Sequence, residues 1–566
     1  MKRTKRPTRG SGKGAVNAKK GKDKIHNSTP LPLSEETSRK LAALPPVEYD
    51  QLRKDESKRL GIRVSVLDDL VAQQRNQDKP APAVESKDSG KKQSTLLLEL
   101  ADDVELFHDG ADAYADIDFG DHRETMALRS QFRQWFKREY WVAFGTAPSE
   151  SAMQEALGVL EGIALWEGVE RKVHVRVAEH DGKVYLDLAD EGWRVVEISP
   201  SGWKVVTRPA VKFVRRNGML PLPAPETGGD LQALRPFVNV ESDEKFILLA
   251  STLLGALHPR GPYTPLILGG EQGSAKSTVA RLLRLLIDPN MVPLRSPPRN
   301  EKDLIVAARN SWLICFDNIS TLPQWLSDAI CRLATGGGLG DRLLFTNLEE
   351  SLCSVKRPII LNGIGSMATS SDLIDRSIIL ELEPLSDFRD ELEFFEAFEA
   401  IRPQLLGSLM DAVSAALRGL PDAQPKDHSL RMMDFSKWII AAEPALPWTA
   451  GSFETAYRRN RGDAVDVVLD DLVADGVRSL LEADPYAELT PTELLLKLAD
   501  VSDDRVTRSK DWPKTPASLS TQLRRLAPAF RCIGIKISLD DPKTGKRLRT
   551  TSGQRLIRLE KAGKTE

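Results

Sequence analysis

Hydrophobic residues recur along the chain with two different periods, and the period changes from one segment to the next. In YDQLRKDESKRLG and SVLDDLVAQQR they recur every three to four positions, which predicts two short helices over residues 41–76. These helices form either a small helix-turn-helix-like element that contacts DNA or a plain two-helix packing element. SQFRQWFKREYWVAFG and SAMQEALGVLEGIALWEG have the same helical period, whereas YADIDF and VYLDLAD alternate as strands do. The pattern therefore predicts a mixed α/β protein.

Length and composition set the expected domain boundaries. A chain of 566 residues is too long for one hydrophobic core, so about three or four domains are expected. Residues 1–40 and 77–95 lack apolar periodicity and are rich in residues typical of a disordered tail and a linker. The other segments are predicted as an α/β domain over 96–222, a domain of alternating strands and helices over 228–385, a helical region over 386–482 and a small domain over 483–566.

Charge and cysteine usage narrow the class of protein. The formal net charge is only −2, but the first 24 residues hold ten basic residues against one acid, Asp23. That tail is either a nucleic-acid-binding arm or a solubilising segment. The four cysteines form no CxxC pair and are expected to be buried thiols, not a disulfide frame or zinc site. Because no apolar run is long enough to span a bilayer, we expect a cytoplasmic protein without a membrane partner.

The strand YADIDF contains a pair of acids, Asp116 and Asp118. Paired acids on a strand are typical of the metal sites of primase-polymerases, but no matching histidine or later acid is evident. We therefore favour the plainer interpretation, that this is an exposed strand end.

The strongest chemical signal is TPLILGGEQGSAKSTVARLLRLLI, in which an apolar strand runs into a glycine-rich turn and then an amphipathic helix. That context predicts a P-loop, whose backbone N–H groups cradle phosphates at a helix N-terminus. Lys276 would reach the β- and γ-phosphates, and the Ser277 hydroxyl would hold Mg²⁺. Ala275 replaces the usual last glycine, and we expect it to take helical backbone at little cost. The candidate nucleotide-binding residues are Gly270, Glu271, Gln272, Gly273, Ser274, Ala275, Lys276, Ser277 and Thr278.

Further candidate catalytic residues follow the P-loop in order. The strand in SWLICFDN ends in Asp317, the expected second Mg²⁺ ligand, and the next residue is Asn318. Asparagine can orient a water but cannot take its proton, so hydrolysis is slow or uses another base. The strand in KRPIILNG ends in Asn362, which can contact the γ-phosphate or the attacking water. Arg376 follows and is either an arginine finger for a neighbouring subunit or a salt-bridge partner of Asp372 or Asp375.

The order of these motifs resembles the AAA+ ATPase core of superfamily 3 helicases, and especially the primase-helicase ATPases of phages, prophages and other mobile elements. The segments WLSDAICRLATGGGLGDRLLFTNLEESLCSVKRPIILNGI and LPPVEYDQLRKDESKRLGIRVSVLDDL also carry the resemblance. It implies a P-loop AAA+ domain of three αβα layers with a mostly parallel sheet. It further implies ATP and Mg²⁺ as cofactors and a homo-oligomeric ring, often a hexamer, that moves along DNA.

The resemblance also implies a hairpin between the second and third motifs, with a basic tip that points into the ring. Strands around Leu343–Phe345 and Leu352–Lys356 are expected to flank it. The tip, TNLEE, is acidic here, and carboxylates repel phosphates. Arg342 and Lys356 on the hairpin sides are then the remaining candidates for DNA contact, and the acidic tip weakens the case for translocation.

The C-terminal pattern of helices followed by two strands around a basic loop predicts a winged-helix-like domain. Its basic residues suit phosphate contacts, although a solvated face on a protein-docking domain has the same pattern. The candidate contacts are Arg524, Arg525 and Arg531 on the helix and Lys543, Lys546, Arg547 and Arg549 in the loop.

The sequence as a whole favours an ATP-hydrolysing, helicase-like motor that acts on single- or double-stranded DNA in mobile-element replication. Other replication proteins are its expected partners. Two alternatives stay open. One is a slow ATP-dependent DNA-binding switch or loader, which the Asn318 and acidic-tip departures support. The other is a non-enzymatic DNA-binding initiator or scaffold.

Overall fold

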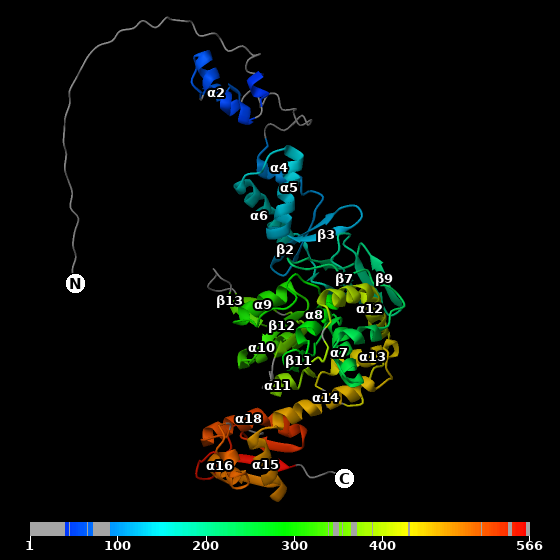
Figure 1. Cartoon of the computed structure of the whole chain (residues 1–566), viewed down its shortest axis with the longest axis vertical. Helices are drawn as coiled ribbons and strands as arrows, with labels where there is room; N and C mark the ends of the chain where they lie inside the picture. Colours follow the sequence, from blue (N-terminus) through cyan, green and yellow to red (C-terminus); the bar gives the residue numbers. More distant parts are fainter. Residues whose placement is uncertain are drawn as a thin grey trace, which may run out of the picture. The chain divides into compact units, whose positions relative to one another are not determined.

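The computed structural model describes residues 40–71, 91–337, 339–342, 350–353, 355–363, 371–387, 389–427, 431–510, 512–541 and 546–561, apart from positions 45, 65 and 69. The N-terminal tail predicted over 1–40 and most of the linker predicted over 77–95 therefore lie outside the described residues. The chain divides into two compact units, residues 1–90 and residues 91–566 (Figure 1). Each is described by itself.

The described part of the first unit, within residues 40–71, is mainly helical. Its main helix, α2 (Pro46–Leu60), packs through Leu60 against Leu67 and Val71, as the apolar periodicity predicts. Val66 of the predicted apolar face is instead 44% exposed. Asp68 ties the later residues back to α2 by accepting hydrogen bonds from Tyr49 at 2.9 Å and Arg53 at 3.0 Å. Whether this element contacts DNA stays a prediction.

The second unit begins with a small α/β subdomain that has its own apolar core, centred on Phe132, Phe136 and Met153. Four strands form a sheet in the order β3-β2-β1-β4, and the predicted helices lie against it. The elements are α4 (Gln93–Glu99), β1 (Glu105–Asp109), β2 (Asp112–Asp118), β3 (Arg123–Ala127), a π-helix (Leu128–Phe132), α5 (Arg133–Phe144), α6 (Glu150–Trp166) and β4 (Val169–Glu170).

The next segment, residues 173–222, forms a second antiparallel sheet in the order β6-β7-β8-β9. This sheet shares its apolar core with the helices and strands that follow residue 230, through Val184, Leu186 and Ile198 among others. Residues 173–222 also pack against the first half of the predicted domain 96–222, where Val175 and Val214 meet Phe107 and Tyr114, so this segment links that half to the larger core. The strands of residues 173–222 are β5 (Val173–His174), β6 (Val177–His180), β7 (Lys183–Asp187), β8 (Val195–Ser199), β9 (Gly202–Val206) and β10 (Lys212–Phe213), of which β5 and β10 pair with each other.

The centre of the second unit is a parallel sheet in the order β12-β15-β11-β16. Arg295 extends it by one parallel bridge to Phe316, beside β12. Alternate residues of each strand face different cores: Leu266 and Leu268 pack with α7 and α8, whereas Ile267 packs with α9 and α10. Helices thus cover both faces of the sheet (Figure 1). The elements are a 3₁₀ helix (Leu231–Phe237), α7 (Asp243–Ala256), β11 (Leu266–Gly270), α8 (Lys276–Ile287), α9 (Glu301–Asn310), β12 (Ile314–Ile319), α10 (Gln324–Thr335), β13 (Leu339–Arg342), β14 (Glu350–Cys353), β15 (Ile359–Gly363), α11 (Ser371–Ile374) and β16 (Ile378–Leu382).

The helical region predicted over 386–482 is not a separate body. Leu405, Met410 and Trp438 lie in the same core as α7 and α8, so α12 and α13 cover the sheet domain. Hydrogen bonds also join α12 to the β6–β9 sheet, from Ser414 Oγ to Ser199 O at 2.7 Å and from Trp203 Nε1 to Asp411 Oδ1 at 2.9 Å. The elements are α12 (Glu391–Gly419), α13 (Met433–Ala442), a 3₁₀ helix (Glu443–Ala445) and α14 (Ser452–Leu469).

The C-terminal domain has a core of its own that starts at Leu469, so the predicted boundary at 483 is about one helix too late. Three strands in the order β17-β19-β18 pack against the helices of this domain, of which α18 is the longest. The elements are α15 (Leu472–Ala483), β17 (Tyr486–Leu489), α16 (Pro491–Asp500), α17 (Asp504–Thr507), α18 (Pro516–Cys532), β18 (Ile535–Ser538) and β19 (Ile557–Lys561).

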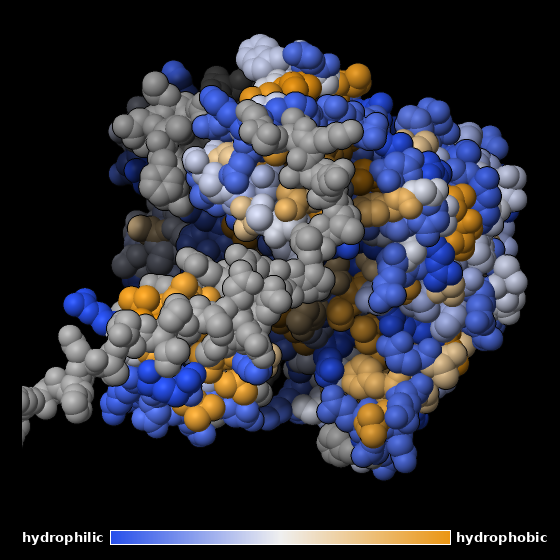
Figure 2. Space-filling model, turned by 90° about the horizontal axis from the view of Figure 1, so that it is seen from above, coloured by the Kyte–Doolittle hydropathy of each residue, from blue (hydrophilic) through white to orange (hydrophobic). Residues whose placement is uncertain are grey.

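Hydrophilic residues cover most of the visible surface. The face seen in Figure 2 is mainly hydrophilic, with hydrophobic residues in scattered patches. None of the helices in the described ranges is long and apolar enough to cross a membrane. Cys315 and Cys331 are buried as expected, and burial raises the pKa of each thiol to about 11, but Cys532 is exposed.

Candidate nucleotide site

The glycine-rich turn joins β11 to α8 with backbone that only glycine adopts easily. Gly270 has φ 136° and Gly273 has φ 85°, both in the left-handed half of conformational space. A Cβ on Gly270 would also clash with the backbone oxygen of Leu382 in the neighbouring strand. The turn therefore brings the chain from the end of β11 to the first residue of α8, Lys276, within six residues.

The Lys276 ammonium is held by the turn itself. Its Nζ donates to the backbone oxygens of Gly270 at 2.8 Å and Glu271 at 2.6 Å, and it lies 3.0 Å from Ser274 Oγ. Burial lowers the pKa of Lys276, and the carboxylates of Glu381 and Asp317 partly oppose that shift. The side chain thus presents a partly desolvated cation at the N-terminus of a helix, where anions are favoured.

The backbone of Ala275 differs from the expectation. It is the N-cap of α8 and has φ 60° and ψ 22°, which is left-handed and not helical. A side chain costs about 1–2 kcal/mol in that conformation because Cβ crowds the following carbonyl. The glycine that usually stands here therefore has a conformational reason, which the sequence interpretation missed.

Replacing Ala275 with glycine is expected to stabilise the protein. The Ala275→Gly variant relieves the left-handed strain, less the extra entropy of an unfolded glycine, so the free energy of unfolding should rise by about 1 kcal/mol. Denaturant unfolding monitored by circular dichroism measures it. Gly273→Ala, the matched reverse change at φ 85°, should destabilise by a similar amount. An unchanged midpoint in both variants would contradict the strain.

Polar side chains from the start of α8 and from two adjacent strands, β12 and β15, meet beside the turn. Ser277 Oγ lies 3.1 Å from Asp317 Oδ1, so the start of α8 and the end of β12 face each other. The backbone N–H of Asn318 donates to Asp317 Oδ1 at 2.7 Å and to Asn362 Oδ1 at 3.0 Å. The second bond joins β12 to β15. Asn362 is buried, and its Nδ2 has no hydrogen-bond partner in the described part of the chain. An orphaned buried donor at such a point requires a partner that the protein does not supply.

Glu381 is a neighbour of the turn that sequence reasoning missed. It lies on β16 directly across from Gly269, where a Cβ would clash with its carboxylate. Desolvation raises the pKa of Glu381, while Lys245 and Lys276 lower it. The residue carries no sequence motif, and only the pairing of β11 with β16 brings it here.

A cavity of 420 Å³ adjoins the turn on the side of Ala275 and Thr278. Aromatic and apolar side chains form much of its wall, and Asn239 fixes one edge by donating to Ser274 O at 3.0 Å and Glu383 O at 2.6 Å. No local sequence pattern indicates this cavity, because most of its wall comes from residues 236–239 and 385–395, which are more than 140 residues apart. The lining includes Phe237, Val238, Asn239, Arg389, Phe394 and Phe395.

Arg376 is paired within its own chain. It forms an ion pair with Asp372 and donates to the Asp372 backbone oxygen at 3.0 Å, which is the salt-bridge alternative that the sequence left open. Asp375 instead pairs with Arg431 and Arg461. Contact of Arg376 with a neighbouring subunit stays a prediction.

The predicted hairpin is only partly described. β13 and β14 pair antiparallel, with Arg342 opposite Glu350, whereas positions 343–349, including most of the acidic tip, lie outside the described residues. Lys356 is not on a hairpin strand as expected, because β14 ends at Cys353. Its side chain lies over Gly336 at the end of α10.

The basic residues of the C-terminal domain have different partners. Arg524 and Arg531 are exposed on α18, and with Lys536 of β18 they line a groove of 540 Å³. Arg525 is instead bound to Asp471, the N-cap of α15, at 2.8 Å.

In the loop between β18 and β19, Lys543 lies outside the described residues. Lys546 and Arg547 are exposed, and Arg549 donates to Gly553 O at 2.7 Å.

The acid pair of β2 is engaged in ion pairs. Asp116 is buried, contrary to the exposed strand end that we expected, and lies 2.5 Å from both Arg123 Nε and Lys212 Nζ. Asp118 is more exposed and pairs with Arg208 at 2.8 Å. Carboxylates neutralised in this way are not arranged as a metal site.

Two family models match consecutive parts of the chain. Residues 231–471 match the replication protein of actinomycete integrative conjugative elements, and residues 473–566 match the C-terminal domain of the same protein, AICE RepA. Together they span more than half of the chain. The chain belongs to the family of actinomycete integrative conjugative element replication proteins.

The family match confirms the expected link to mobile-element replication. The glycine-rich turn, Asp317, Asn362 and Arg376 all lie within the first family model, and the α18 groove lies within the second. Residues 91–230 precede both models, although 173–222 share the core of the first. No protein with a curated description matches this family member significantly.

Solved structures give a weaker likeness. The SCCmec type IV Cch protein, described as an active helicase, has a TM-score of 0.41 at 11% identity, covering 81% of this chain and 92% of its own. The C-terminal region of NrS-1 has a TM-score of 0.38 at 11% identity, covering 83% of this chain and 99% of its own. Scores this low do not assign a fold or a function.

Proposed function

We propose that this replication protein binds ATP with Mg²⁺ and hydrolyses it to drive movement on, or remodelling of, DNA. The observation that carries the proposal is the convergence of Lys276, Ser277, Asp317 and Asn362 at the carboxyl ends of adjacent parallel strands. In open parallel sheets, ligands bind at that edge. The strand order, with the Arg295 bridge beside β12, supports the P-loop AAA+ arrangement.

The residues present fit a nucleotide and its metal. Lys276 would exchange its loop carbonyls for phosphate oxygens, which bind an ammonium more strongly because they carry charge. Ser277 and Asp317 offer two hard oxygen atoms side by side, as Mg²⁺ prefers. The buried Nδ2 of Asn362 would find its missing acceptor in the γ-phosphate or the attacking water.

The cavity beside Ala275 suits the nucleobase of the same nucleotide. Phe237, Phe394 and Phe395 offer apolar area, and Arg389 lines the same cavity. Flat aromatic and apolar walls with a few polar groups are typical of small-molecule pockets. Adenine is therefore the part of ATP that we assign to this cavity.

Asn318 supports slow hydrolysis. It occupies the position where a carboxylate would accept the proton of the attacking water, and asparagine has no such basicity. An Asn318→Asp variant keeps the side-chain shape, and aspartate tolerates the left-handed φ of 58°. We expect its ATP turnover to rise at least about 10-fold in a steady-state phosphate-release assay. Equal or lower turnover at unchanged ATP affinity would show that another group is the base.

The α18 groove supports contact with the DNA backbone. Arg524, Arg531 and Lys536 make no ion pair within the described ranges, so their charge is available to phosphates. We expect Arg524→Ala and Arg531→Ala each to weaken DNA binding and to reduce the slope of log K against log salt by about 1. Arg525→Ala is the matched control: its guanidinium is held by Asp471, so it should alter stability and leave the salt slope unchanged. Fluorescence anisotropy with labelled duplex measures all three.

Two assays separate the motor from its alternatives. We expect ATP hydrolysis to be stimulated by DNA, and a forked duplex to be unwound in the presence of ATP. Hydrolysis without unwinding would favour the switch or loader, which the acidic TNLEE tip supports. ATP binding without turnover would favour a non-enzymatic initiator. Subunit counting with and without an ATP analogue tests the proposed ring and the role of Arg376 in it.

A further inference from the structure

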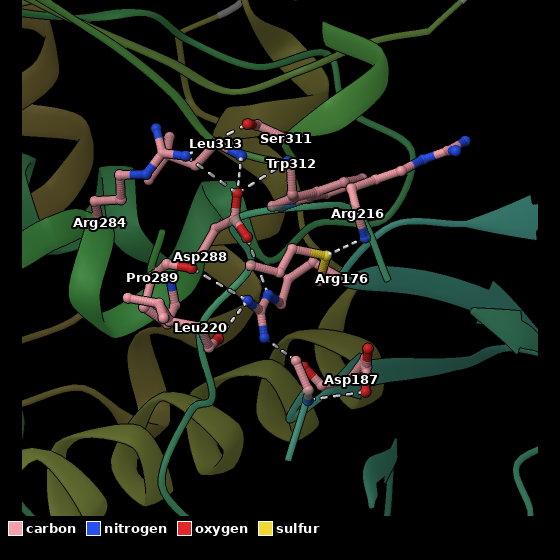
Figure 3. A network of polar contacts seen from close by, with 12 residues as sticks. Arg176, Asp187, Arg216, Leu220, Arg284, Asp288, Pro289, Ser311, Trp312 and Leu313 are labelled. Atoms are coloured by element: carbon pink, nitrogen blue, oxygen red, sulfur yellow. Dashed lines mark hydrogen bonds and ion pairs between the residues drawn. The ribbon is translucent and has the colours of Figure 1, made fainter. Parts of the chain in front are cut away.

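A fully buried ionic contact lies at the far end of the helix that begins with Lys276. Asp288 caps the C-terminus of α8 and has an exposed fraction of 0%. Its Oδ2 accepts the backbone amides of Trp312 at 3.0 Å and Leu313 at 3.1 Å, immediately before β12 begins. One carboxylate thus joins the end of the P-loop helix to the start of the strand that carries Asp317 (Figure 3).

The other oxygen of this carboxylate is bound from the upstream segment. Arg176, also 0% exposed, donates from Nε to Asp288 Oδ1 at 3.0 Å. It is oriented by further bonds to the backbone oxygens of Asp187 at 3.0 Å and Leu220 at 2.9 Å. Arg176 adopts φ 65°, an unfavourable backbone for arginine that the surrounding bonds impose. Figure 3 shows its guanidinium directed at the carboxylate from the β6–β9 side.

A backbone connection reinforces the same junction. The Leu220 amide donates to Pro289 O at 3.0 Å, and Met219 pairs with Asn290 just beyond α8. Arg284, on α8 itself, is a more distant cation at 3.8 Å from Asp288. The segment 173–222 therefore contacts the end of α8 where α8 meets β12, although it precedes both family models.

We propose that Asp288 is a positioning residue of the nucleotide site and that Arg176 holds it in place. The inference rests on the proposed nucleotide binding. Helix α8 carries Ser277 at its start, and β12 carries Asp317 near its end. Asp288 fixes the angle between α8 and β12. That angle then sets the distance between Ser277 Oγ and Asp317 Oδ1, the two oxygens that we propose bind Mg²⁺. Residues 173–222 are accordingly part of the working nucleotide site.

The test compares nucleotide affinity with Mg²⁺ and with EDTA in the full-length chain, using a fluorescent ATP analogue. Phosphate contacts of the P-loop persist in both buffers, whereas the Ser277–Asp317 spacing matters only with Mg²⁺. Asp288→Asn and Arg176→Met should lower the ratio of the two affinities about 10-fold. Arg176→Lys keeps a cation beside the carboxylate and should stay within about twofold of wild type. Loss of general stability alone would lower both affinities and leave the ratio unchanged.

The matched control is Arg260→Ala. Arg260 pairs with Glu179 and so joins the same upstream segment to the core, but it is 74% exposed, and its loss should not alter the ratio. A wild-type ratio in folded Asp288→Asn and Arg176→Met would overturn the positioning role. If Asp288→Asn does not fold, the affinity ratio of Arg176→Met becomes the test. That variant should fold, because Arg284 still faces the carboxylate of Asp288. Failure of both to fold, with Arg260→Ala intact, would make the pair purely structural and overturn the inference. A wild-type chain that binds no nucleotide in either buffer would overturn the proposed function and this inference with it.

Discussion

Lys276→Ala is expected to weaken ATP binding about 30- to 100-fold, which corresponds to about 2–3 kcal/mol. The ammonium is the cation at the start of α8, and the carbonyls of Gly270 and Glu271 already hold it at the centre of the turn. Alanine keeps the helix but removes a charge-assisted bond to the phosphates. Isothermal titration with a non-hydrolysable ATP analogue measures the loss.

The control for Lys276→Ala is Lys497→Ala, which removes an exposed lysine from α16 in the C-terminal domain. It should bind ATP as the wild type does. Matching affinities in wild type and Lys276→Ala would contradict the P-loop and every proposal that depends on it. Because Lys276 is itself bound to loop carbonyls, both variants should also be checked for unchanged thermal unfolding.

Asp317→Asn should abolish most Mg²⁺-dependent hydrolysis, with turnover lowered about 1000-fold. The carboxylate lies 3.1 Å from Ser277 Oγ and is the charged member of the proposed metal pair. Asparagine preserves its shape and can still accept the Asn318 amide, so the end of β12 should keep its geometry. Phosphate release at saturating ATP measures the effect.

The contrasting variant for Asp317→Asn is Asp328→Asn, a change of the same charge on α10, where Asp328 accepts a bond from Gln324. Its turnover should equal that of the wild type. ATP affinity in EDTA should also survive in Asp317→Asn, since Lys276 and the turn remain. Full turnover in Asp317→Asn would move the metal site elsewhere and remove the reason for pairing Ser277 with β12.

The local parts of the candidate site could be predicted from the sequence. The glycine-rich turn is a continuous segment, so its glycines, Lys276 and Ser277 stand next to one another in the sequence. Asp317 and Asn362 were predictable because both end apolar strands, and parallel strands end at the same edge. The structure brings both beside the turn, as the hydrogen bonds through Asn318 show.

The remaining parts depend on contacts that no local pattern encodes. Glu381 reaches the turn only through the pairing of two strands more than 100 residues apart. Arg176 and Asp288 are 112 residues apart and carry no motif. One apolar core is assembled from segments on both sides of the predicted boundaries at 222 and 386, and no local pattern indicates that sharing. The left-handed backbone of Ala275 was missed because the identity of a residue does not determine its φ.

Helix α14 connects all three large apolar cores of the second unit. Phe453 near its start is buried in the main core, Ala464 in the core on the other face of the sheet, and Leu469 at its end in the C-terminal domain. Between them, Asn460 clamps the edge strand β16 by bonding to both the amide and the carbonyl of Ile379, at 3.1 and 2.5 Å. A displacement of the C-terminal domain would therefore be transmitted through α14 to β16, the strand that pairs with β11 beside the glycine-rich turn.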